Sequence, residues 1–124
     1  MATPKATGSL RDRIFAKDDI IKEKVEVEEW GVTVEVRSMT GRERAQSMKE
    51  YVDEEGNVDA ERLYPALIVA TVYDPTTGEP VFQPEDAASL NLKNSGALEK
   101  LAQVAIRLSG MGQKAVDEAG KGSS

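Results

Sequence analysis

The stretch NSGALEKLAQVAIRLSG, residues 94–110, carries the clearest helical pattern in the chain and decides the fold. At about 100° per residue its apolar side chains span an arc of roughly 200°, wider than the stripe that a surface helix usually buries. Asn94 stands where an N-cap belongs, Gly110 where a left-handed C-terminal cap belongs, and Arg107 in the last turn. The pattern predicts a helix that either lies at the centre of a small core or keeps part of its arc for a partner.

The apolar arc of this helix divides into a centre and two flanks. The predicted core face consists of Leu98, Leu101, Ala105 and Leu108. Val104 and Ile106 lie on opposite flanks and are candidate partner contacts. Met111 follows the helix and is a third candidate, because flexible methionine side chains suit adaptable binding surfaces.

A change to a two-residue period from Lys24 to Arg37 predicts an antiparallel β-hairpin. Valines alternate there with charged residues and threonine, so one face should be buried. The predicted turn is Trp30-Gly31, and Trp30 is either a packing anchor for the sheet or the fourth candidate partner contact. Because a two-stranded ribbon is not stable alone, helices must cover it.

A short helix is predicted ahead of the hairpin. Residues 1–8 are small and polar and are expected to be flexible. Ser9 can cap a helix over the next six residues. Its apolar side chains, Leu10, Ile14 and Phe15, are expected to face the core.

Two more helices are predicted after the hairpin. A capping box at Thr40 begins the first, and Asp59 caps the second. Pro65 means that the second helix either begins near that position or bends there. The apolar run 66–73 also fits a buried strand; we expect helix to about Thr71 and then a short extended piece.

The remaining segments are shorter. Residues 74–80 are rich in turn formers and predict a second small hairpin, and a short helix should start at Gln83 and end near Leu90. The sequence thus predicts a mainly helical small α+β fold, with an N-terminal antiparallel β-hairpin packed on helices. It forms one domain over residues 9–119, with a weak helical piece at its end, and residues 120–124 are a flexible tail.

Composition argues against most kinds of catalytic site and metal site. The chain has no cysteine and no histidine, which removes thiolate ligands, the commonest transition-metal ligand and the commonest general base. The acidic run between Glu50 and Glu61 does not follow the ligand spacing of a calcium loop, and GKGSS at the end lacks the order of a phosphate-binding loop. We expect no enzyme activity, cofactor or metal.

The charge pattern bears on partners. The net charge is −6 and no basic stripe is present, so nucleic acid is not an expected partner. No apolar run is long enough for a transmembrane helix, and we expect neither a membrane nor a secretory signal. Self-association stays open, because a wide apolar arc is compatible with it.

The order and spacing of four segments resemble one known family. These segments are SLRDRIFAKDD, VEVEEWGVTVEVRSMTGRER, YPALIVATVYDPTTGEPVFQPEDAASL and the end AIRLSGMG, which together cover most of residues 9–116. The chain resembles the small tail assembly chaperones of long-tailed, siphovirus-type bacteriophages, in the form common in phages of actinobacteria.

The resemblance implies binding without catalysis. Such a protein binds the long, largely helical tape-measure protein in the host cytoplasm, keeps it soluble, helps to recruit tail-tube subunits, and is absent from the finished virion. The alternatives are a structural phage component, such as a tail-completion or head–tail connector protein, or an unrelated cytosolic adaptor domain.

Overall fold

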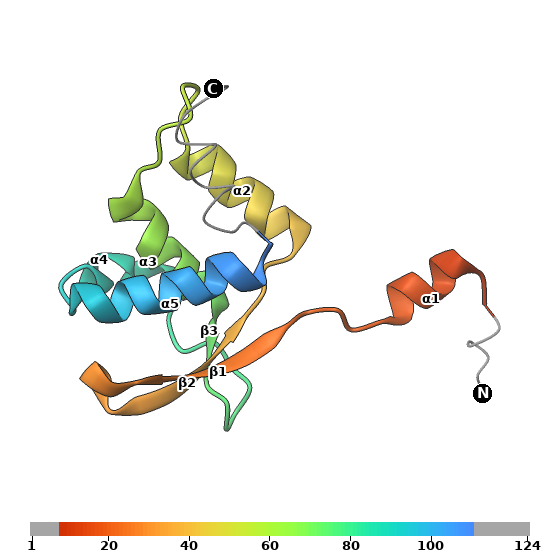
Figure 1. Cartoon of the computed structure of the whole chain (residues 1–124), viewed down its shortest axis with the longest axis horizontal. Coiled ribbons are helices and arrows are strands. Elements are labelled where there is room, and N and C mark those ends of the chain that lie inside the picture. Colours follow the sequence, from red (N-terminus) through yellow and green to blue (C-terminus); the bar gives the residue numbers. More distant parts are fainter. Residues whose placement is uncertain (1–7, 111–124) are drawn as a thin grey trace.

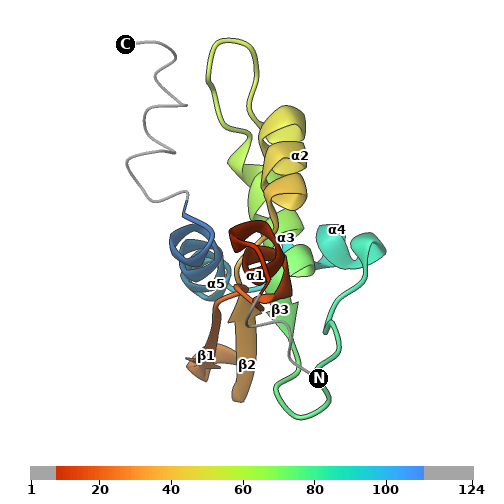
Figure 2. The same cartoon turned by 90° about the vertical axis from the view of Figure 1, so that its right-hand side faces the viewer.

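The structure is a computed structural model that describes residues 8–110. A three-stranded antiparallel sheet in the order β1-β2-β3 lies beneath a group of helices (Figure 1). Figure 2 shows α5 and α4 on either side of α3, above the strands. The predicted α+β class, with an N-terminal hairpin followed by helices, is confirmed. Residues 1–7 of the predicted flexible N-terminus 1–8, the helical piece predicted after Met111 and the predicted tail 120–124 lie outside the described residues.

The hairpin joins β1 (Lys22–Val27) to β2 (Val32–Arg37). Val25 pairs with Val34, and both side chains are buried, as the alternation predicts. The turn is longer than the two residues expected, since the short 3-10 helix η2 (Glu28–Trp30) precedes Gly31. Gly31 has a φ of 66°, a conformation that a residue without a Cβ adopts at little cost. The turn therefore includes the predicted residues Trp30 and Gly31.

The third strand, β3 (Val72–Tyr73), was not predicted as a member of this sheet. It pairs antiparallel with β2, with Val72 opposite Val36. The expected second hairpin is reduced to a single bridge between Tyr73 and Pro80. The Arg37 guanidinium lies 3.9 Å from the centre of the Tyr73 ring, which fastens β3 to its neighbour.

Helix α3 (Ala60–Thr71) settles the ambiguity of the apolar run, because it continues to Thr71 before the chain enters β3. Pro65 lies inside it, so the helix neither starts at the proline nor is stopped by it. A proline cannot donate to the carbonyl four residues earlier, which here belongs to Glu61. Asn91 Nδ2 donates to that carbonyl at 2.9 Å, so a side chain from another part of the chain replaces the missing bond.

The other predicted helices form close to their expected bounds. Helix α2 (Gly41–Tyr51) begins with the complete capping box of Thr40 and Glu43. The segment after Gln83 forms a 3-10 turn, η3 (Pro84–Asp86), and then α4 (Ala87–Leu90). All three elements pack against α3.

Helix α5 (Ser95–Leu108) is the centre of the domain and uses the caps predicted for it, Asn94 at its start and Gly110, with a φ of 76°, just after it. Its apolar side chains belong to two clusters. The first contains Leu98, Leu101 and Ala105 with the valines of the hairpin, Ile68, Val72, Leu90 and Ala97. The second contains Ala102 and Ile106 with Met39, Leu63 and Leu67. The wide arc is therefore explained by core on two sides of one helix.

Helix α1 (Leu10–Ala16) forms with Ser9 as its N-cap, as predicted, but it buries none of its residues. The expectation that its apolar side chains face the core is wrong: Leu10, Ile14 and Phe15 are 66%, 58% and 74% exposed. Figure 1 shows α1 standing away from the domain, joined to β1 by residues 17–21. Local capping and periodicity formed the helix, but nothing in the described chain covers it.

Candidate partner-binding surface

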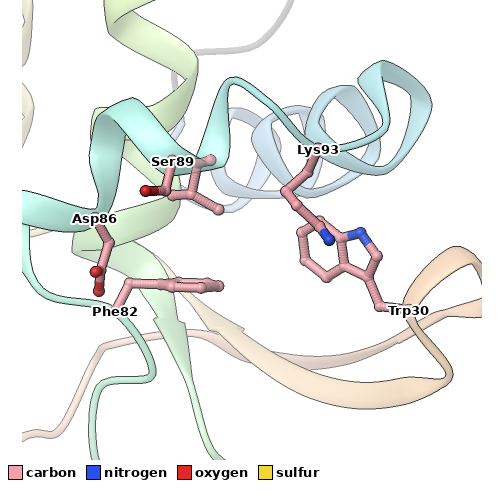
Figure 3. A pocket seen from close by; sticks show the side chains of 6 residues that line it. Trp30, Phe82, Asp86, Ser89 and Lys93 are labelled. Carbon is pink, nitrogen blue, oxygen red and sulfur yellow. The ribbon is translucent and has the colours of Figure 1, made fainter.

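The candidate binding surface is a mostly apolar pocket of about 340 Å³. We call it the Trp30 pocket, and it is lined by Trp30, Phe82, Asp86, Ser89, Leu90 and Lys93. Figure 3 shows these side chains around the pocket; they come from the hairpin turn, the segment before α4, α4 itself and the loop between α4 and α5. Its size lies near the lower end, roughly 300 Å³, of protein ligand pockets.

The fold brings the walls of the Trp30 pocket together from distant parts of the sequence. The left-handed Gly31 reverses the hairpin directly after Trp30 and so holds the indole at the end of the ribbon. The Asp86 carboxylate accepts from the amide of Gln83 at 2.7 Å, which fixes the turn beside Phe82. Leu90 is only 3% exposed and anchors α4 in the core. The walls are thus held by backbone turns and by core packing.

Trp30 has two roles in this arrangement. Its ring is partly buried and packs against the first core cluster, as the packing interpretation predicted. It also lines the pocket, so a bound partner would touch it. Within residues 8–110 its Nε1 is buried without a hydrogen-bond partner. A buried donor in that state costs about 1–3 kcal/mol.

Of the other three predicted partner contacts, Val104 and Ile106 do not line the Trp30 pocket. Val104 is partly buried and packs against the first core cluster. Ile106 is 2% exposed, so the expectation that it lies on a free flank is wrong. The reason is that Leu63 and Leu67 of α3, with Met39, cover that flank of α5. Met111 lies outside the described residues.

The large exposed apolar side chains fall into two groups. The first is on the N-terminal segment: Leu10, Ile14, Phe15 and Ile21. The second group is Val32, Val81 and Leu92, and each of these lies within two residues of a side chain that lines the Trp30 pocket. Sequence reasoning missed this pocket, because Phe82 and Leu90 are more than fifty residues from Trp30. The isolated Trp30 was the signal that pointed toward it.

The acidic loop after α2 is organised by its own hydrogen bonds. Asp53 accepts from the amides of Glu55 and Asn57 at 2.9 and 2.8 Å. These bonds, led by the one from Asn57, lower the pKa of Asp53 below its ordinary value. Within the described part of the chain, no three acidic side chains gather in a way that could hold a metal ion. The Asp53 carboxylate therefore serves to hold the loop in its conformation.

One ion pair ties α5 to the edge of the sheet. Arg107 Nη2 donates to Glu23 Oε2 at 2.8 Å, and this bond raises the pKa of Arg107 above its ordinary value. Both partners are well exposed, so the pair orients the helix end more than it stabilises the fold. No helix among residues 8–110 has both the length and the apolar character needed to cross a membrane.

Comparison with known proteins gives a likeness to a solved structure but none to a family model. No family model matches the chain, and no curated protein matches it in sequence. The solved structure of the bacteriophage HK97 tail assembly chaperone does match, with 18% identity and a TM-score of 0.55. The match covers 72% of this chain and 85% of the HK97 chain. The chain therefore has the fold of a phage tail assembly chaperone.

Proposed function

We propose that this protein is a bacteriophage tail assembly chaperone that binds the tape-measure protein, keeps it soluble and helps to recruit tail-tube subunits. The fold shared with the HK97 chaperone is the observation that carries the proposal. The protein acts in the host cytoplasm and does not remain in the finished virion. The actinobacteriophage type stays a prediction from the sequence.

The Trp30 pocket is the proposed contact for the client. A long helical client exposes apolar stripes that aggregate unless they are covered. An amphipathic helix can insert one or two apolar side chains between Trp30 and Phe82, in the common helix-in-groove mode. The excess of acidic residues around the pocket would keep the complex soluble.

The proposal is tested by co-expression with the tape-measure protein of the same phage. We expect the chain to move this client from the pellet to the soluble fraction and to co-purify with it. Ser89→Arg places a long side chain in the pocket without touching the core, since Ser89 is exposed. We expect it to reduce the co-purified client by about tenfold or more, as for loss of a central contact.

The matched control is Gln46→Arg, which makes the same charge change on the exposed face of α2, outside the pocket. This variant should hold as much client as the wild type. Equal client recovery with Ser89→Arg would place the client elsewhere on the surface. A tape-measure protein that stays insoluble beside the wild-type chain would overturn the function itself.

The place of the protein in assembly is tested separately. Quantitative mass spectrometry of purified virions should find the tube and tape-measure proteins but not this chain. Stoichiometric amounts in the virion would instead support a structural component of the tail.

A further inference from the structure

Helix α1 has a form that requires a partner. It contains seven residues, and isolated helices shorter than about 12–15 residues are marginal in water. Its Leu10 and Ile14 lie on one face, with Phe15 at the edge of that face, and all three are exposed. A helix so short is stabilised mainly by packing of its apolar face. We call residues 8–21, which include α1, the arm.

The surface that matches the arm lies at the other end of the hairpin. The arm leaves the domain at the start of β1, whereas Trp30 lies past the end of that strand (Figure 1). All the large exposed apolar side chains of the described residues are either in the arm or next to the Trp30 pocket in sequence. The arm is a protruding helix with an apolar face, and the Trp30 pocket is an apolar recess that could hold such a face.

The charges of the two surfaces are also complementary. The part of the arm that would dock, residues 10–17, carries three basic side chains and one acidic one, and the two acidic residues that follow in the linker bring the whole arm to a net charge of zero. The two segments that surround Trp30 and Phe82, residues 26–34 and 79–92, carry six acidic side chains and no basic one. Lys93 adds a single positive charge at the pocket. Complementary charge favours encounter and orientation between such surfaces.

We propose that α1 of one copy of this protein docks by its apolar face in the Trp30 pocket of a second copy. Because the arm and the pocket lie at opposite ends of the hairpin, each copy can contact two neighbours, one through its arm and one through its pocket. Such a head-to-tail contact is heterologous and builds rings or open chains.

A second copy fits better than the arm's own domain. Two hydrogen bonds to Ser38 hold Ile21 at the end of the sheet. The free linker is therefore residues 17–20, which span at most about 18 Å from Ala16 to Ile21 when fully extended. The strand β1, along which the arm would have to return, is six residues long and covers roughly 20 Å before the turn that carries Trp30. The linker is thus shorter than the strand it would have to follow.

One consequence rests on the proposed function. If the client helix and the arm use the same pocket, a client displaces the arm, and self-association covers the apolar recess until a client arrives. Loss of the arm should then leave client binding intact or strengthen it.

The first test is light scattering after size-exclusion chromatography of the full chain over a range of concentrations. The wild type should increase in mass with concentration. Ile14→Asp should weaken self-association by about tenfold or more, since a charge would enter an apolar recess. Ala16→Asp makes the same charge addition on the other face of α1 and should behave as the wild type. A wild type that stays monomeric at every concentration would overturn the proposal, as would equal effects of the two arm variants.

The second test mixes two variants that should each be monomeric. Ile14→Asp keeps an intact pocket, and Ser89→Arg keeps an intact arm. Only one arm-to-pocket contact can form in the mixture, so we expect a closed 1:1 complex. No complex would mean that the arm does not bind this pocket. Client recovery with Ile14→Asp separates the two proposals: unchanged recovery with lost self-association leaves the chaperone function standing, whereas self-association without client solubilisation leaves only the arm contact.

Discussion

Helices α5 and α1 have the same kind of N-cap but lie in different surroundings, α5 in the core and α1 exposed. Asn94 Oδ1 accepts from the amide of Ala97 at 3.0 Å, and Ser9 Oγ accepts from the amide of Asp12 at 3.1 Å. Both helices carry an apolar face. Yet α5 buries six residues in two core clusters, and α1 buries none.

The difference teaches that capping and periodicity form a helix, whereas stability comes from what lies across its apolar face. In α5 that face is covered by the hairpin on one side and by α3 on the other. In α1 nothing among the described residues covers it. The same kind of substitution should therefore change the free energy of unfolding by different amounts in the two helices.

The largest contrast is expected for leucine truncation. Leu101→Ala removes a side chain that is 0% exposed and should lower the free energy of unfolding by about 2–5 kcal/mol. Leu10→Ala should change it by less than about 0.5 kcal/mol, as at other surface sites. Urea unfolding followed by circular dichroism, at a concentration where the chain is monomeric, measures both. A loss above about 1 kcal/mol for Leu10→Ala would show that the arm packs on its own domain.

The caps give a smaller contrast. Asn94→Ala should lower the global free energy of unfolding by about 1 kcal/mol, because one amide of a core helix loses its acceptor. Ser9→Ala should leave that free energy unchanged and reduce only the helical content of residues 10–16, visible in carbon-13 chemical shifts. A global loss from Ser9→Ala would contradict the independence of the arm.

The smallest effect is expected for the hydrogen bond that Asn91 donates to a carbonyl of α3; within residues 8–110, α1 receives no such bond from the domain. Asn91→Ala should cost about 0.5–1 kcal/mol, since the Glu61 carbonyl loses its donor. In a Pro65→Ala background, position 65 regains an amide that can serve this carbonyl, so the same substitution should cost less. A double-mutant cycle in urea measures the difference. Equal costs in both backgrounds would mean that the Asn91 bond does not compensate for the proline.

Much of the fold could be read from local patterns. The caps at Ser9, Thr40 and Asn94 form as predicted, because each bond joins residues three apart. The hairpin turn follows from the valine alternation and Gly31, and the end of α3 at Thr71 agrees with the expected change to extended structure. These features depend on neighbours in the sequence, so the sequence contains what is needed to predict them.

The binding surface could be predicted only in part. Trp30 was singled out as one residue, but its pocket needs Phe82 and Leu90, and no local rule joins them. Ile106 looked like a free flank because a helical wheel shows one helix and omits α3 and Met39, which cover that flank. The same limit made α1 look like a core helix.

By itself the sequence determined where the helices and the hairpin lie, how they are capped, and that chemistry based on cysteine or histidine is absent. Only the tertiary structure decided which apolar faces find cover: both flanks of α5 do, and that of α1 does not. The physical reason is the distance along the sequence over which each effect acts. Capping and periodicity act over three or four residues, whereas burial depends on elements that meet only when the chain has folded.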